Sequence, residues 1–164
     1  MESRAKLFGH AIHPIMIVFP LGLLATGVIF DVIYLIWGNL TFATVSYWMI
    51  AAGIVGGALA APFGWIDWFA IPGGTRAKSI GLYHGLINVA VLILFAASWW
   101  LRPDVPAKAP TIAYILSFAG TGLALIAGWL GGELVERLGG VGVDDGAHLN
   151  APNSLSGKPA SQND

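Results

Sequence analysis

Four long apolar runs, separated by short polar segments, occupy most of the chain. A helix that crosses the hydrocarbon core of a bilayer needs about 20 mostly apolar residues. Four stretches of the sequence meet this requirement, at residues 14–37, 42–66, 79–101 and 110–131. Asp31 is the one formally charged residue inside them. The pattern predicts an all-α integral membrane protein, a four-helix bundle of up-down-up-down topology within residues 1–143.

The remaining residues, 144–164, differ sharply from the rest of the chain. Asn, Ser, Pro and Gly are frequent there, and large apolar side chains are nearly absent. Such a composition buries too little apolar surface to offset the entropy of ordering the chain. We therefore expect a disordered C-terminal tail.

The composition supports a membrane protein and excludes several functions. Hydrophobic residues make up 56% of the sequence, charged residues only 10%, and the mean hydropathy is +0.73. So few charged side chains could not cover a soluble domain with a surface of ordinary polarity. With a net charge of −1, the chain lacks the excess of positive charge that binds nucleic acid. Cysteine is absent, which excludes thiolate metal sites, covalent c-type haem attachment and cysteine catalysis in this chain.

The basic residues that flank the helices predict the orientation. With four spans, the N-terminal segment, the second loop and the end of the last helix share one side of the membrane. That side carries Arg4, Lys6, Arg76, Lys78 and Arg137, whereas the opposite side has Arg102 and Lys108. Lys and Arg are enriched in cytoplasmic loops. We therefore expect a multi-pass membrane protein with both termini in the cytoplasm.

Small residues recur at every fourth position in the second and fourth apolar stretches. These two ladders are Ala52, Gly56, Ala60 and Gly64, and Gly120, Ala124, Gly128 and Gly132. Because lipid gives helices no hydrophobic drive to associate, close contacts in a membrane depend on such residues. The ladders predict tight packing inside the bundle, or against partner subunits or a second copy of the chain. A smooth groove for a flat cofactor is the alternative.

Ionisable side chains gather at one shallow level on the predicted inner face. The residues expected there are His10, His13, Asp67, His84, Glu133 and His148. Asp31 lies eighteen residues after His13, about 27 Å along the helix axis, and so belongs near the outer face. It shares the angular face of His13. Because a carboxylate in lipid is costly, we expect Asp31 to point into the bundle.

The histidines have a structural and a functional interpretation. His10 and His13 are placed to cap the first helix, and His84 is placed to form a satisfied interhelical hydrogen bond together with Asn88, one turn away. Imidazole nitrogen is also an axial ligand of haem iron, and helical bundles hold cofactors between facing helices. The candidate pair for haem b is His13 and His84, with His10 as the substitute for His13. A bare Zn, Fe or Cu site on these histidines and a carboxylate is a second version.

Charged neighbours fit either interpretation. The basic residues available to haem propionates at the water boundary are Arg76 and Lys78, or Arg4 and Lys6. Asp67 and Glu133 are the carboxylates expected beside the ligands of a metal ion. Without a cofactor, Asp67 would close the second loop, and Arg76 and Lys78 would only fix the orientation.

Three runs of the sequence resemble a known family of bacterial membrane proteins. They are GHAIHPIMIVFPLGL (residues 9–23), GWIDWFAIPGGTRAKSIGLYHGLIN (64–88) and GWLGGELVERLGGVGV (128–143). Together they are similar to the family catalogued as domain of unknown function 2231, over about residues 8–143. The resemblance implies a four-helix membrane domain. It also implies a redox setting, because relatives of this type are joined to Rieske iron–sulfur or cytochrome c domains.

Individual positions follow the family pattern with one departure. The matching residues are His13, Pro14, Pro20, Asp67, His84, Asn88, Gly131, Gly132 and Glu133. Relatives often carry a further histidine just before the Phe-Pro pair, where this chain has Val18. If that histidine is a ligand in relatives, the cofactor is lost or held differently here.

Two classes of function follow from these observations. The first is a small b-type cytochrome of a redox or energy-conversion system, which passes electrons between a quinol pool and a Rieske or cytochrome partner. The second is a cofactor-free accessory subunit that packs against a larger respiratory or photosynthetic complex. Transport fits less well, because Asp31 is a single internal carboxylate and no inverted repeat is obvious. We expect no enzyme, because the sequence contains neither a nucleophile elbow nor an HExxH motif.

Overall fold

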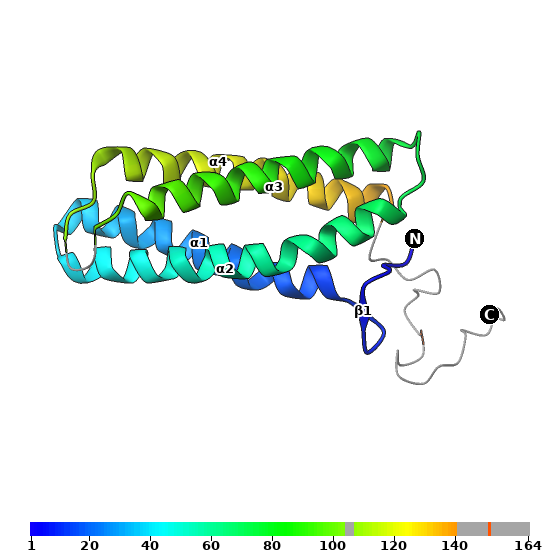
Figure 1. Ribbon diagram of the computed structural model, residues 1–164, viewed down its shortest axis with the longest axis horizontal. Coiled ribbons are helices and arrows are strands. Elements are labelled where there is room, and N and C mark those ends of the chain that lie inside the picture. Colours follow the sequence, from blue (N-terminus) through cyan, green and yellow to red (C-terminus); the bar gives the residue numbers. More distant parts are fainter. Residues whose placement is uncertain (104–106, 141–150, 152–164) are drawn as a thin grey trace.

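Four long helices dominate the computed structural model, which describes residues 1–103, 107–140 and 151 (Figure 1). They are α1 (Ile12–Trp37), α2 (Leu40–Ala70), α3 (Arg76–Trp100) and α4 (Thr111–Gly132), and α4 continues into one π-helical turn, η1 (Glu133–Arg137). A short antiparallel pair, β1 (Lys6–Leu7) and β2 (His10–Ala11), precedes α1. All four helices are long and apolar enough to cross a membrane. The predicted all-α membrane fold is therefore confirmed, whereas the predicted tail lies outside the described residues except for Ala151.

At the second loop, α2 and α3 extend beyond their predicted spans. α2 runs to Ala70 instead of residue 66, and α3 begins at Arg76 instead of residue 79. α3 starts where the hydroxyl of Thr75 accepts a hydrogen bond from Lys78 N at 3.1 Å. Hydropathy falls at the water boundary, whereas helical hydrogen bonding continues to the next capping residue. Apolar length alone therefore ends α2 too early and begins α3 too late.

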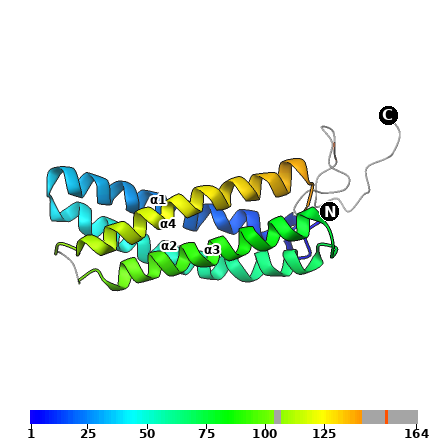
Figure 2. The ribbon, with the colours of Figure 1, turned by 90° about the horizontal axis from the view of Figure 1, so that it is seen from above.

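The four helices form two antiparallel hairpins. α1 and α2 are joined at Gly38, whose φ of 71° is readily adopted only by glycine. α3 and α4 form the second hairpin, and the helices pack more closely within a hairpin than between hairpins (Figures 1 and 2). The end of the bundle that holds residues 1–11 is called the N-terminal end below, and the opposite end is called the hairpin end. The predicted inner level corresponds to the N-terminal end.

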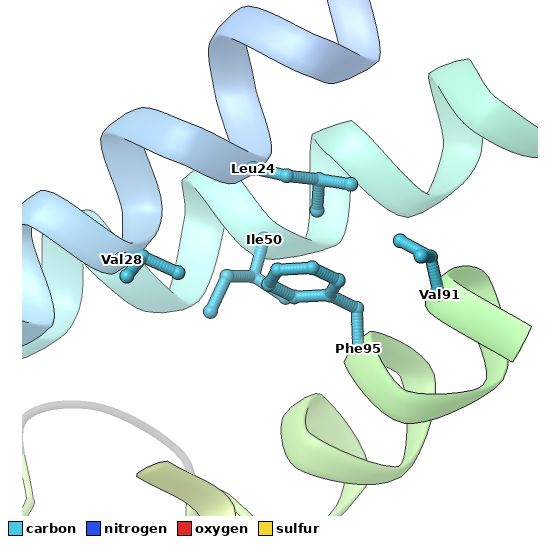
Figure 3. Close-up of a cluster of buried hydrophobic side chains, with 5 residues drawn as sticks. All are labelled: Leu24, Val28, Ile50, Val91 and Phe95. Atoms are coloured by element: carbon cyan, nitrogen blue, oxygen red, sulfur yellow. The ribbon is translucent and has the colours of Figure 1, made fainter. Parts of the chain in front are cut away.

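An apolar layer fills the middle of the bundle. It consists of Leu24, Val28, Ile50, Val91 and Phe95, whose side chains converge from α1, α2 and α3 (Figure 3). Ile50 and Phe95 are almost completely buried. The outward faces are apolar as well, with Leu125 and Trp100 among the most exposed side chains, as expected for contact with lipid.

The second hairpin repeats internal contacts of the first. A Cβ on Gly53 of α2 would lie 2.6 Å from Leu24 Cδ2 of α1, and a Cβ on Gly120 of α4 would lie 3.0 Å from the Phe95 ring of α3. A shift of 71 positions carries Leu24 to Phe95, and a shift of 67 positions carries Gly53 to Gly120. α1 and α3 both begin at the N-terminal end, so the repeat is parallel and not inverted.

The two glycine ladders differ in what they contact. In α2, a Cβ on Gly56 would lie 2.9 Å from the Phe19 ring and 3.3 Å from Pro20 Cδ, so this ladder holds α1 and α2 together. In α4, a Cβ on Gly128 or Gly132 would meet no atom of the described chain within 4 Å. The predicted tight contact inside the bundle is therefore confirmed for Gly56.

Candidate functional site

His13 lies in the first turn of α1 and contacts α2. Its Nδ1 is 3.1 Å from the carbonyl oxygen of Ala60, and its ring lies against Gly64, where a Cβ would be 2.8 Å from Cε1. The interpretation of His13 as a helix cap is wrong. The cap residue of α1 is Ala11, without a side-chain bond, and the amide of Ile12 donates to Ala5 O at 2.9 Å. The ring has turned away from the helix end because α2 offers both a carbonyl and a space without a side chain.

His84 makes the equivalent contacts between α3 and α4. Its Nδ1 is 2.9 Å from Ala127 O, and a Cβ on Gly131 would be 3.1 Å from its Cε1. Asn88 Nδ2 donates to His84 O at 2.9 Å and lies 3.2 Å from His84 Nε2. The predicted interhelical hydrogen bond of His84, supported by Asn88, is therefore confirmed.

The two imidazoles form a matched pair. The shift of 71 positions carries His13 to His84, and the shift of 67 positions carries Gly64 to Gly131. In each case an Nδ1–H that donates to a helix carbonyl fixes the tautomer and leaves Nε2 with its lone pair. Both rings are half-buried at the N-terminal end. The site therefore presents two oriented Nε2 atoms from parallel helices.

The other metal-ligand candidates have different surroundings. His10 lies in β2 and is exposed. Glu133 pairs with Arg76 at 2.7 Å and with Arg137 at 3.4 Å. Within residues 1–103 and 107–140, no group of three or more His, Asp and Glu side chains is arranged to hold a metal ion. His148, also expected at this level, lies outside the described residues.

Asp67 holds the N-terminal segment and not the second loop, so the expectation that it closes that loop is wrong. Ser3 Oγ donates to the two carboxylate oxygens at 2.7 and 2.8 Å, and Arg4 N donates to Oδ1 at 3.0 Å. Asp67 is nearly fully buried by these contacts. The carboxylate is satisfied in this way because residues 3–5 cross the end of α2.

The second loop is held by Lys78 and Trp68. Lys78 Nζ donates to Trp68 O at 2.7 Å and lies 3.9 Å from the centre of the Trp68 ring, while Trp68 Nε1 donates to Lys78 O at 3.0 Å. Arg76, paired with Glu133, keeps 66% of its side chain exposed at the end of the bundle. The two basic residues thus join helix ends as well as supplying positive charge at the boundary.

A second polar site lies near the hairpin end, where Asp31 pairs with Arg102. Arg102 Nη1 donates to Asp31 Oδ1 at 2.7 Å, and Nη2 donates to Oδ2 at 2.6 Å. The Asp31 side chain is fully buried and that of Arg102 is 3% exposed. The predicted inward orientation of Asp31 is confirmed.

Three serines complete this site from the surrounding helices. Ser46 of α2 donates to Asp31, Ser117 of α4 donates to Asp31 Oδ2 at 3.3 Å, and Ser98 of α3 accepts from Arg102 Nη2 at 3.3 Å. From its position just beyond the third apolar run, Arg102 is predicted only as a loop charge, and its pairing with Asp31 is not predicted. One signal was available, since Arg102 follows His84 by the same eighteen residues by which Asp31 follows His13.

The departure at Val18 does not bear on either polar site. Val18 lies on α1 and is 68% exposed, so its side chain points out of the bundle. A histidine at this position would therefore face lipid or a neighbouring protein, away from His13.

Comparison with known proteins places the chain in a family. Residues 9–145 match the family described as "Predicted membrane protein (DUF2231)", and the chain belongs to it. No curated protein and no solved structure matches the chain. The family description agrees with the four membrane-spanning helices.

Proposed function

Starting from a four-span membrane protein of this family, we propose that the chain belongs to a redox or energy-conversion system and carries haem b between His13 and His84. The matched geometry of these two histidines carries the proposal. Each Nδ1–H is fixed on a helix carbonyl and each ring lies on a glycine, at corresponding positions of two parallel helices. Histidines that bind metal commonly donate their other ring N–H to a carbonyl in this way.

Binding of haem iron requires a free Nε2 on each histidine, and for His84 this depends on a movement of Asn88. Among the described residues, Nε2 of His13 has no hydrogen-bond partner. Nε2 of His84 lies 3.2 Å from the Asn88 amide, which also bonds to His84 O. Binding would require Asn88 to turn from Nε2 while its bond to the carbonyl is kept. Haem held there would supply reversible one-electron chemistry.

The chain's own side chains would orient the cofactor and keep water from it. The exposed guanidinium of Arg76 and the ammonium of Lys78 lie at the N-terminal end, where propionates would meet water. The middle apolar layer, a cluster of buried hydrophobic side chains, separates this end from the Asp31–Arg102 site. That arrangement favours electron transfer over transport, with a quinol pool and a Rieske or cytochrome protein as the proposed partners.

A cofactor-free accessory subunit is the second candidate, and one observation favours it. Both ring nitrogens of His84 are engaged within the bundle, by Ala127 O and by Asn88. An imidazole satisfied in this way is a stable structural element without any ligand. In this case the exposed apolar faces and the open glycines Gly128 and Gly132 would contact a partner subunit or a second copy. For both candidates we propose the bacterial inner membrane, with both termini in the cytoplasm.

A difference spectrum separates the two candidates. The protein is purified in mild detergent, and a reduced-minus-oxidised spectrum is recorded together with a pyridine haemochrome assay. We expect a Soret band in the wild type that is lost in His84→Ala and in His13→Ala. His10→Ala is the matched control, because His10 is exposed in β2, and it should keep the band.

A colourless wild-type protein would overturn the haem proposal. An elemental scan of that sample then tests for bare Zn, Fe or Cu. Copurification of the colourless protein with a larger membrane assembly would support the accessory subunit.

A further inference from the structure

The buried ion pair joins corresponding positions of the two hairpins. The shift of 71 positions that carries His13 to His84 and Leu24 to Phe95 also carries Asp31 to Arg102. Asp31 belongs to the first hairpin, and Arg102 directly follows the last turn of α3 in the second. The other corresponding positions compared above carry identical or similarly apolar residues in the two hairpins. Asp31 and Arg102 differ from them because they carry opposite charges.

The two charges meet each other across the boundary between the hairpins. Both Nη groups of Arg102 donate to the Asp31 carboxylate, and both side chains are buried. The hydroxyls of Ser46 and Ser98 bind the same guanidinium from α2 and α3. The pair is thus a buried polar link between the hairpins at this end, whereas Trp68 and Lys78 link α2 to α3 by hydrogen bonds at the N-terminal end.

A charge in this position controls which hairpins can pair. Two first hairpins packed in the same way would set a carboxylate against a carboxylate, and two second hairpins would set a guanidinium against a guanidinium. Unpaired or like charges inside a membrane protein are strongly unfavourable. Only the mixed pair is neutral, much as single polar positions select partners in coiled coils.

We infer that Asp31 and Arg102 act as a pairing code between two repeated hairpins. The inward surface of the first hairpin fits the second hairpin and rejects a copy of itself. The inference is independent of any cofactor, because it rests on the hairpin end of the bundle and not on the histidines.

The pairing code between Asp31 and Arg102 predicts which charge variants of the full-length chain can associate with each other. In Asp31→Arg both hairpins carry an arginine at this level, and in Arg102→Asp both carry an aspartate. Each variant alone therefore has like charges within the chain and between two copies. A mixture of the two variants can restore two neutral pairs when the hairpins of one chain pair with those of the other.

The test coexpresses full-length chains that carry two different affinity tags. We expect Asp31→Arg and Arg102→Asp to copurify with each other at a higher yield than either variant copurifies with itself, and higher than two wild-type chains. The same substitutions appear in all the variant combinations, so general damage to the fold is controlled. Equal recovery of mixed and homotypic variants would overturn the inference, and so would degradation of both variants in the mixture.

A double exchange within one chain provides the second measurement. Asp31→Arg with Arg102→Asp should regain the wild-type elution profile in size-exclusion chromatography, which each single variant should lose. Because arginine is larger than the aspartate that it replaces, Asp31→Lys with Arg102→Glu is tested in parallel. Failure of both double variants to recover would count against the pairing code, as would wild-type behaviour of either single variant.

Discussion

The imidazole of His13 lies on Gly64 so closely that a Cβ at position 64 would be 2.8 Å from His13 Cε1. Gly64→Ala should therefore push the ring from its place and weaken its bond to Ala60 O. Overpacking of this kind costs about 1–3 kcal/mol. We expect a lower midpoint of thermal unfolding in detergent and, if haem is bound, a weaker Soret band.

Gly128→Ala is the control for this substitution, because a Cβ there would meet nothing within 4 Å. Alanine is favoured over glycine within a helix by up to about 1 kcal/mol. The control should unfold at the same temperature as the wild type or slightly above it. Equal losses in both variants would show that the contact between His13 and Gly64 has no special role.

Arg102→Ala should be among the most destabilising substitutions in the chain. It leaves the Asp31 carboxylate buried without a counter-charge, which costs about 3–5 kcal/mol. Arg102→Lys keeps the charge but loses the two parallel bonds, so we expect an intermediate loss. Glu2→Gln breaks an exposed ion pair with Lys6 and should change stability by less than about 1 kcal/mol. Equilibrium unfolding in mixed micelles provides the comparison.

Asp67→Ala should release the N-terminal segment from the end of α2. The substitution removes the acceptor of Ser3 Oγ and Arg4 N. Trypsin should then cut after Arg4 and Lys6 faster than in the wild type, with the helices left intact. Glu136→Ala changes an exposed acidic residue and should leave the cleavage rate unchanged. Identical digestion of all three proteins would contradict this role of Asp67.

Single cysteines can test the predicted orientation, because the natural chain contains none. Lys108 and Glu136 are exposed at opposite ends of the bundle. In intact cells, a membrane-impermeant maleimide should label Lys108→Cys, and it should label Glu136→Cys only after permeabilisation. The reverse pattern would place both termini outside the cytoplasm.

The helices could be predicted from the sequence because apolar length alone determines what can span a bilayer. The inward orientation of Asp31 also followed from a general cost, that of a carboxylate in lipid. Its partner could not be found in the same way, since Arg102 lies just beyond an apolar run and resembles an ordinary flanking charge. Only the comparison of Asp31 and Arg102 with the histidines eighteen residues before them would have revealed the pair.

The hydrogen bonds of the histidines to backbone carbonyls could not be predicted from the sequence, for a different reason. His13 and His84 bind the carbonyls of Ala60 and Ala127, and a carbonyl acceptor leaves no trace in residue type. Gly64 belongs to the predicted ladder of α2, but Gly131 lies outside the predicted ladder of α4, and neither glycine was predicted as the place where an imidazole ring lies. Asp67 was misassigned because its partners belong to an N-terminal segment whose course no pattern predicts.

The separation of Asp31 from Arg102 along the chain has a consequence for synthesis of the protein. The two residues are 71 positions apart, so the carboxylate enters the membrane before its counter-charge has left the ribosome. At about 5–20 residues per second, this delay is on the order of 4 to 14 s. Ser46 follows Asp31 by only 15 positions and is its earliest partner in the finished fold. Until translation has passed the end of α3, Ser46 is therefore the one residue of the finished ion-pair site that is available to the Asp31 carboxylate.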